Sequence, residues 1–372
     1  MRVPFADIKL HPKCKDHVND CLNSNHLTLG KKTDLLEKRW SEINKHRWTV
    51  AVNSGTSACL AACLALYTKG AKPGDEIITP GLSFIATSTA IRAAGFTPVW
   101  CDVKKETLNI DVDLIKPLIV VGKTIAIMPV SLMGKPSRIN DIKSISDENN
   151  LSLIVDNCEG HGCRLNDYVM EDYADITVYS AYAAHCLFSV ELGLCDTNDD
   201  YWRDALYSVR SHGRKPHSLF FSHDLFGLNL KPTDLHASIG LGSLEEYKTV
   251  IDKRRCNVEF FRTELDNLSP FCYFSEEEDN EFCSPHAFSL TFKEDSGYDM
   301  GLFRKWMELN EIEVKINFGA IPDHGCFAYL NKQGSCPNAT YIGKHGCHWS
   351  VNQNLTQDQL NYVVDIVQRF FK

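Results

Sequence analysis

Short apolar runs alternate with helical patterns along the first half of the chain. Between residues 49 and 199, runs rich in β-branched and aliphatic residues recur, and stretches with apolar residues at helical spacing separate several of them. The runs lie at residues 49–55, 75–80, 97–103, 124–134, 151–158 and 175–182. Strands that alternate with helices form right-handed crossovers, which produce a mostly parallel sheet covered on both faces. We therefore expect an α/β fold that binds its ligands at the carboxyl ends of the strands.

The pattern changes in the last third of the chain. An amphipathic stretch at residues 236–268 predicts a long helix. An acidic, turn-rich segment at 275–286 follows, and a compact α+β pattern then runs to residue 372. We place a domain boundary inside the long helix, with a large domain at residues 1–245 and a small C-terminal domain at 246–372.

Charge and composition exclude several classes of protein. The chain is 44% hydrophobic and has a net charge of −9, which argues against nucleic acid or an anionic membrane as a partner. No apolar run reaches the roughly 18–20 residues of a membrane span. The start of the chain lacks the apolar core of a signal peptide, so we expect a cytoplasmic protein.

The fifteen cysteines suggest disulfides or a metal, but their spacing supports neither. There is no C-x-x-C pair, and Cys59 and Cys63 fall four residues apart in an apolar helical stretch. Cysteine behaves there as a small hydrophobic residue. We expect mostly reduced, buried thiols and no metal site.

Two motifs lie where predicted strands end. In VNSGTSA, residues 52–58, Gly55 allows close backbone approach, and the first helical turn with Thr56 and Ser57 could bind an anion. A plain helix cap would have the same sequence. In LIVDNCEGHG, residues 153–162, Asp156 and Glu159 follow a buried strand. An acid there could bind a metal, cap a helix or pair with a protonated ring nitrogen.

Together with further segments, these motifs resemble the DegT/DnrJ/StrS sugar aminotransferase family of fold-type I pyridoxal-phosphate enzymes. The further segments are PFADIK, GDEIITPGLSFIATSTAI, CDVKKETLNID, PVSLMGKP, SVRSHG, GLNLKPTDLHASIG and ATYIGKHG, which span nearly the whole chain in order. The resemblance implies a three-layer fold like that of aspartate aminotransferase, with a smaller α+β C-terminal domain. It also implies pyridoxal 5′-phosphate or pyridoxamine 5′-phosphate as the cofactor.

The resemblance implies a phosphate site shared between two subunits. The amides of Gly55 and Thr56, with Ser57, would hold the cofactor phosphate, and Ser180 matches a serine that contacts it. Asn229 matches an asparagine that reaches the cofactor phosphate of the neighbouring subunit. A homodimer with its site at the subunit interface is therefore expected.

The resemblance also implies contacts to the cofactor ring. Phe84 would stack on the pyridine ring, and Asp156 would pair with its N–H⁺ and keep the ring an effective electron acceptor. Glu159 stands where the aminotransferases usually carry glutamine, and glutamate there is similar to the dehydratase branch of the family.

His185 falls where the aminotransferases place the lysine that binds the cofactor covalently. The stretch DITVYSAYAAHCLFSVELG, residues 175–193, contains no lysine. An imidazole cannot form that bond, but its usual pKa near ~6.5 suits proton transfer at neutral pH. The same exchange characterises the branch that includes the GDP-4-keto-6-deoxymannose 3-dehydratases. The resemblance thus implies a pyridoxamine-phosphate enzyme that removes the C3 hydroxyl of a nucleotide-linked 4-keto-6-deoxysugar, with His185 as base.

Other features bear on this interpretation. Iron–sulfur relatives need a C-x-C pair, and Cys195, Cys256, Cys272 and Cys283 form none, which favours a cluster-free enzyme that glutamate recycles as amino donor. The chain departs from the family pattern at a few positions, where bulk or a lost Arg could alter the pocket: Ala184, Val190, Leu192 and Lys315. Two alternatives stay open: a nucleotide-sugar aminotransferase, and a non-catalytic binding protein on the same scaffold.

Overall fold

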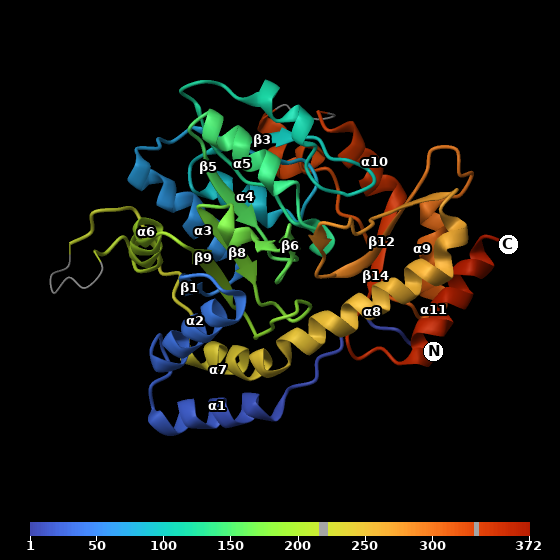
Figure 1. The fold of residues 1–372 in the computed structure, drawn as a ribbon, viewed down its shortest axis with the longest axis horizontal. Helices are drawn as coiled ribbons and strands as arrows, with labels where there is room; N and C mark the ends of the chain where they lie inside the picture. The colour runs from blue at the N-terminus through green and yellow to red at the C-terminus, as the bar shows by residue number, and fades with distance from the viewer. Residues whose placement is uncertain (216–221, 331–334) are drawn as a thin grey trace.

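The computed structural model describes residues 1–215, 222–330 and 335–372. Figure 1 shows a large layered part around a central sheet and a smaller part with its own sheet, and α8 (Tyr247–Leu265) runs along both. Both termini lie beside the smaller part (Figure 1). Among the described residues, no helix combines the length and apolar character that crossing a membrane requires.

The central sheet has seven strands. Their order across the sheet is β1 (Trp48–Val52), β9 (Gly193–Thr197), β8 (Ile176–Ser180), β5 (Ser152–Asp156), β4 (Thr124–Ile127), β2 (Glu76–Pro80) and β3 (Thr97–Cys101). All neighbouring pairs are parallel except those of β9, which runs antiparallel to β1 and β8. The six predicted runs all contain strands, which confirms the expected α/β fold with a mostly parallel sheet. The pattern did not reveal β9, whose sequence GLCDT includes an aspartate, a residue depleted from strands.

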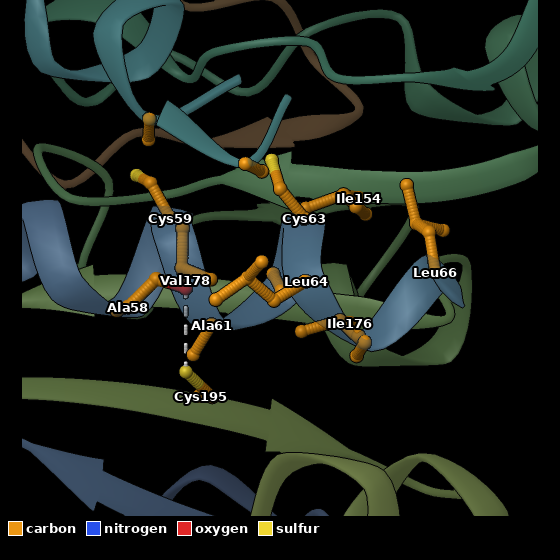
Figure 2. Packing of buried hydrophobic residues seen from close by; sticks show 14 of the residues in the cluster. Ala58, Cys59, Ala61, Cys63, Leu64, Leu66, Ile154, Ile176, Val178 and Cys195 are labelled. Atoms are coloured by element: carbon orange, nitrogen blue, oxygen red, sulfur yellow. Dashed lines mark hydrogen bonds between the residues drawn. The ribbon is translucent and has the colours of Figure 1, made fainter. Parts of the chain in front are cut away.

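Helices pack on this sheet and complete its core. They are α2 (Lys31–Asn44), α3 (Gly55–Ala65), α4 (Ala86–Ala93), α5 (Ile139–Glu148), α6 (Asp200–Arg210) and α7 (Asp234–Ser243), and α1 (Pro12–Ser24) packs on α7 (Figure 1). Figure 2 shows Cys59 and Cys63 of α3 packed among Ile154, Ile176 and Val178 of the sheet. Both thiols are at most 1% exposed, so these cysteines act as small core residues, as expected.

The predicted long helix is divided into two. A 3-10 turn at Leu244–Glu246 separates α7 from α8. A Cβ atom at Gly242 would lie 2.3 Å from the backbone nitrogen of Cys14, so α7 can pack this closely on α1 only with glycine there. The contact between α7 and α1 is a tertiary contact, so the hydrophobic pattern of residues 236–268 could not predict it.

The smaller part is built on an antiparallel sheet. Its strand order is β10 (Cys272–Phe274), β12 (Ala287–Phe292), β14 (Gly346–Ser350) and β13 (Val314–Ile316), and its helices are α9 (Met300–Leu309), α10 (Pro337–His345) and α11 (Gln357–Phe370). A third, short sheet contains β11 (Glu281–Phe282), β6 (Arg164–Leu165) and β7 (Tyr168–Val169). Val3 is buried in the core of the smaller part. The division between residues 245 and 246 stays a prediction.

Candidate active site

A cavity of about 490 Å³ lies at the carboxyl ends of β5 and β8, beside the start of α3. It is lined by seven of the nine predicted site residues: Gly55, Thr56, Phe84, Asp156, Glu159, Ser180 and His185. Ser57 and Asn229 are not among its lining residues. The structure thus gathers residues from across the first half of the chain, while their roles toward a cofactor stay predictions.

The start of α3 serves both as a capped helix end and as one wall of the cavity. The Oγ of Ser54 accepts a hydrogen bond from the backbone N–H of Ser57 at 3.1 Å, so Ser57 belongs to the cap. A Cβ atom at Gly55 would lie 2.5 Å from the Cβ of Ser180. Glycine therefore permits α3 to begin against the end of β8, and the positive end of the helix faces the cavity at Gly55 and Thr56.

Asp156 is a fixed carboxylate at the end of β5 and is 5% exposed. Its Oδ2 accepts a hydrogen bond from the Thr87 hydroxyl at 2.6 Å, and its Oδ1 accepts one from the Cys158 N–H at 3.2 Å. These bonds hold the carboxylate in place at the cavity. An anion held in this way suits a protonated ring nitrogen.

Glu159 lies on the loop that follows Asp156. Burial raises the pKa of Glu159 to about 7, and the charge of Asp156 adds to this, whereas the Met133 amide and Lys315 lower it. The Met133 N–H donates to the Oε2 of Glu159 at 2.8 Å. Glu159 therefore titrates near neutral pH, next to the hydrogen-bonded carboxylate of Asp156.

His185 lies between two other imidazoles. Its ring stacks on His161 with 5.5 Å between centroids and 11° between planes, and His286 lies 5.0 Å away on a tilted plane. Burial, followed by the neighbouring His161 and Arg254, lowers the pKa of His185 well below 6.5. Its buried Nδ1 has no hydrogen-bond partner among the described residues. His185 is therefore a neutral imidazole that can accept a proton.

Three histidines of this site were not found by the sequence analysis. His161, within the motif that holds Asp156, donates from Nε2 to the carbonyl of Ser180 and accepts at Nδ1 from the Leu187 N–H. These two bonds lock a neutral ring, and burial lowers the pKa of His161 to about 3. His286 and His348 enter the cavity from the smaller part, where no local motif marks them.

The departures from the family pattern lie partly outside the cavity. Val190 is exposed and Leu192 is buried in a separate core cluster, and neither lines the cavity. Their bulk therefore leaves the pocket open. Lys315 does line it, with Nζ 3.9 Å from the ring centroid of Phe5, and it is the one lysine among the described lining residues.

These features fit a cofactor with a phosphate, a flat ring and a basic ring nitrogen. The start of α3, where a Cβ at Gly55 would collide with Ser180, offers amides to a phosphate. Asp156 offers an anion, and the exposed ring of Phe84 offers a flat apolar face. The unpaired Nδ1 of His185 adds a proton acceptor beside them.

Layers of helices around a mostly parallel seven-stranded sheet, with the cavity at the strand ends, give this chain the fold of the fold-type I pyridoxal-phosphate enzymes. Residues 9–368 match the DegT/DnrJ/EryC1/StrS aminotransferase family, and the chain belongs to this family of pyridoxal-phosphate- and pyridoxamine-phosphate-dependent enzymes. The expected family and cofactor class are thereby confirmed.

The relatives include two different activities. The chain is 29% identical to a GDP-4-keto-6-deoxy-D-mannose 3-dehydratase from Yersinia pseudotuberculosis, over 98% of both chains. It is 27% identical to a GDP-perosamine synthase from Escherichia coli O157:H7, over 99% of this chain and 98% of that one. The structure of the E. coli GDP-4-keto-6-deoxy-D-mannose-3-dehydratase with bound hydrated PLP superposes with a TM-score of 0.89, at 23% identity over 99% of both chains. This last likeness concerns the fold.

Proposed function

We propose that the protein is a 3-dehydratase that removes the C3 hydroxyl of a nucleotide-linked 4-keto-6-deoxysugar in deoxysugar biosynthesis. The observation that carries this proposal is His185, a neutral imidazole in the cofactor cavity at the position where the family resemblance expects a lysine. The name of the relative from Yersinia supports it, and a lipopolysaccharide biosynthesis protein of Salmonella typhimurium, 28% identical, supports a role in making O-antigen sugars.

Different residues around the cavity would bind different parts of the cofactor. Gly55 and Thr56 bind the cofactor phosphate at the start of α3, and Asp156 keeps the ring nitrogen protonated. When bound, pyridoxamine phosphate supplies an amine that condenses with a ketone and a ring that accepts electrons. Phe84 covers one face of that ring.

His185 then transfers the protons. With the cofactor bound, its neutral ring would accept a proton, and the resulting imidazolium would donate that proton to the C3 oxygen of the substrate as it departs. His161 stacks on this ring and holds its plane through both transfers. Because no lysine amine stands at this position, the amine form of the cofactor stays available to the substrate.

The remaining partners follow from this proposal. Glutamate would restore the cofactor amine after each turnover. A homodimer would place Asn229 of one subunit at the phosphate of the other, and we place the enzyme in the cytoplasm, where nucleotide sugars are available.

The test is a product assay with GDP-4-keto-6-deoxymannose, pyridoxamine phosphate and glutamate. The proposal expects a 3-deoxy sugar and one ammonia for each glutamate consumed. A 4-amino sugar without ammonia release would identify an aminotransferase instead. If neither the sugar nucleotide nor glutamate is consumed, the protein is a non-catalytic binding protein on this scaffold.

A nucleotide-sugar aminotransferase is the second candidate. Lys315 lines the same cavity and could bind the cofactor covalently, and a GDP-perosamine synthase is 27% identical to the chain. Borohydride reduction of the enzyme loaded with pyridoxal phosphate separates the candidates. A reduced cofactor on Lys315, absent from Lys315→Met, supports the aminotransferase; an unlabelled protein supports the dehydratase.

A further inference from the structure

A second group of ionisable side chains lies at the other end of the central sheet. Asp196 of β9 pairs in register with Thr49 and Thr177, near the amino ends of β1 and β8. The cofactor cavity lies at the opposite ends of these strands, beside Ser180. Next to Asp196 are His46, which precedes β1, and Glu171, in the turn before β8.

These three residues, which we call the His46 cluster, are buried and close together. His46, Glu171 and Asp196 are 8%, 2% and 0% exposed. One potential ligand atom of each lies within 4.8 Å of those of the other two. An imidazole and two carboxylates thus share one interior site.

Each member of the His46 cluster uses one polar atom and leaves one unused. The Nε2 of His46 lies 3.3 Å from the Oδ2 of Asp196 and 2.8 Å from the Thr49 hydroxyl. Tyr179 donates its O–H to the Oε1 of Glu171, and Trp40 donates its N–H to the Oδ2 of Asp196.

The unused atoms are the Nδ1 of His46, the Oε2 of Glu171 and the Oδ1 of Asp196. None of them has a hydrogen-bond partner within the part of the chain that the structure describes. Buried polar atoms are normally paired, because an unpaired one loses the hydrogen bonds that water would supply. Two unpaired carboxylate oxygens beside a buried imidazole call for a shared cation.

We propose that His46, Glu171 and Asp196 bind one divalent transition-metal ion of the Zn²⁺ type. Imidazole nitrogen and carboxylate oxygen are ordinary zinc ligands, with metal–ligand distances of about 2 Å. Side chains whose ligand atoms already lie within 4.8 Å reach that geometry by small rotations. The charge of +2 matches the charge of two carboxylates.

The surrounding bonds support this assignment. The Nε2 of His46 already faces the Oδ2 of Asp196 at 3.3 Å, so this ring nitrogen and that carboxylate are placed to bind the same ion. Tyr179 and Trp40 hold the two carboxylates in position.

An acidic surface hollow lies beside the His46 cluster. Glu171 lines this hollow, which also contains four aspartates and two cationic residues. The aspartates are Asp172, Asp175, Asp199 and Asp200, and the cationic residues are Arg47 and Lys143. An acidic hollow raises the local concentration of cations. The His46 cluster uses no cysteine, so the cysteine spacing could not have revealed it.

The test begins with the full-length protein, stripped with a chelator and titrated with Zn²⁺ or Co²⁺. We expect one ion per chain by mass spectrometry of the metal and a higher unfolding temperature with Zn²⁺. The Co²⁺ form should show visible absorption without sulfur-to-cobalt charge transfer in the near ultraviolet. Stoichiometric binding with that charge-transfer band would mean a cysteine site and would overturn the proposal.

Matched variants locate the ion. Glu171→Gln keeps an acceptor for Tyr179 but removes the carboxylate, and it should abolish both Zn²⁺ binding and the stabilisation. Asp172→Asn, in the same hollow but outside the His46 cluster, should leave both unchanged. Equal binding by Glu171→Gln, or no stoichiometric binding by the unaltered protein, contradicts the site. If Glu171→Gln does not fold, the Co²⁺ spectrum of the unaltered protein decides.

Discussion

His185 owes its neutral form to the residues that surround it. Burial removes water that would stabilise the imidazolium, and the guanidinium of Arg254 lies near enough to disfavour a second positive charge. Arg254 also donates to the backbone carbonyl of Ala184, so one residue both positions the loop and lowers the pKa of His185. The imidazole is held in the form that accepts protons.

Replacement of His185 with asparagine should remove dehydration while the cofactor still binds. General-base catalysis contributes about 10²- to 10⁴-fold, so turnover should fall by that range. The measurement is 3-deoxy sugar formation, together with cofactor affinity by fluorescence titration. His17→Asn, on α1 and outside the cavity, is the matched control. A His185→Asn enzyme with near-normal turnover would exclude His185 as the base.

The pH dependence of the reaction should come from Glu159. The pKa of His185 is well below 6.5, so its ring is neutral near pH 7 and its titration causes no step there. Glu159, with a pKa of about 7, loses its proton as the pH rises through that value. A step near pH 7 in cofactor affinity or kcat/KM should disappear in Glu159→Gln. Its persistence in that variant would assign the step to another group.

At the scale of elements, the cofactor site depends on one close approach between a helix and a strand. The first residue of α3 lies against the end of β8, so the amides of α3 face the cavity. α8 has a similar role from the other side, because Arg254 reaches from it to the loop that carries His185. Secondary structure thus fixes the proposed phosphate-binding groups, and Arg254 holds the loop that carries the proposed base, His185.

Alanine at Gly55 should separate α3 from β8. The added Cβ would lie 2.5 Å from the Cβ of Ser180 and 3.2 Å from its Cα, so the backbone must shift. Overpacking of this kind costs about 1–3 kcal/mol, and we expect a similar loss in the free energy of unfolding with a weaker affinity for pyridoxal phosphate. Chemical denaturation and cofactor titration measure both. Gly325→Ala, where no atom lies within 4 Å of the new Cβ, should change neither.

At the scale of the whole molecule, the two ends of the central sheet carry different groups. The cofactor cavity lies at the carboxyl ends of the parallel strands, and the His46 cluster lies at their amino ends. Tyr179 of β8 connects the two regions, since its O–H bonds to Glu171 and its ring packs edge-on against His161. Changes at the His46 cluster can therefore reach the imidazole that supports His185.

The proposed homodimer makes a prediction about Asn229, which is exposed and does not line the cavity of its own chain. Asn229→Ala should weaken cofactor binding about tenfold, the effect of one lost bond to a charged group of roughly 1.5 kcal/mol. Subunit exchange between His185→Asn and Asn229→Ala should then restore activity above both parents at limiting cofactor. A hybrid dimer would contain one site with neither change. If the mixed sample is no more active than the two variants measured separately, Asn229 does not contribute to the partner's site.

The sequence by itself determined the α/β class and the motifs of the cofactor site. Strand periodicity and the residues that follow a strand are local properties, so six strands and Asp156, Glu159 and Gly55 could be located without a structure. The same holds for the position of His185, which follows a predicted strand in a motif that resembles the family.

Only the tertiary structure decided which distant residues meet. His286 and His348 come from the smaller part and line the same cavity as His185. The segment Gly193–Thr197 is a strand because it pairs with both β1 and β8 in the folded sheet. Glu171 and Asp196 lie more than a hundred residues after His46, and the three share no local signature. Convergence of this kind depends on how separate elements pack, and local periodicity carries no information about it.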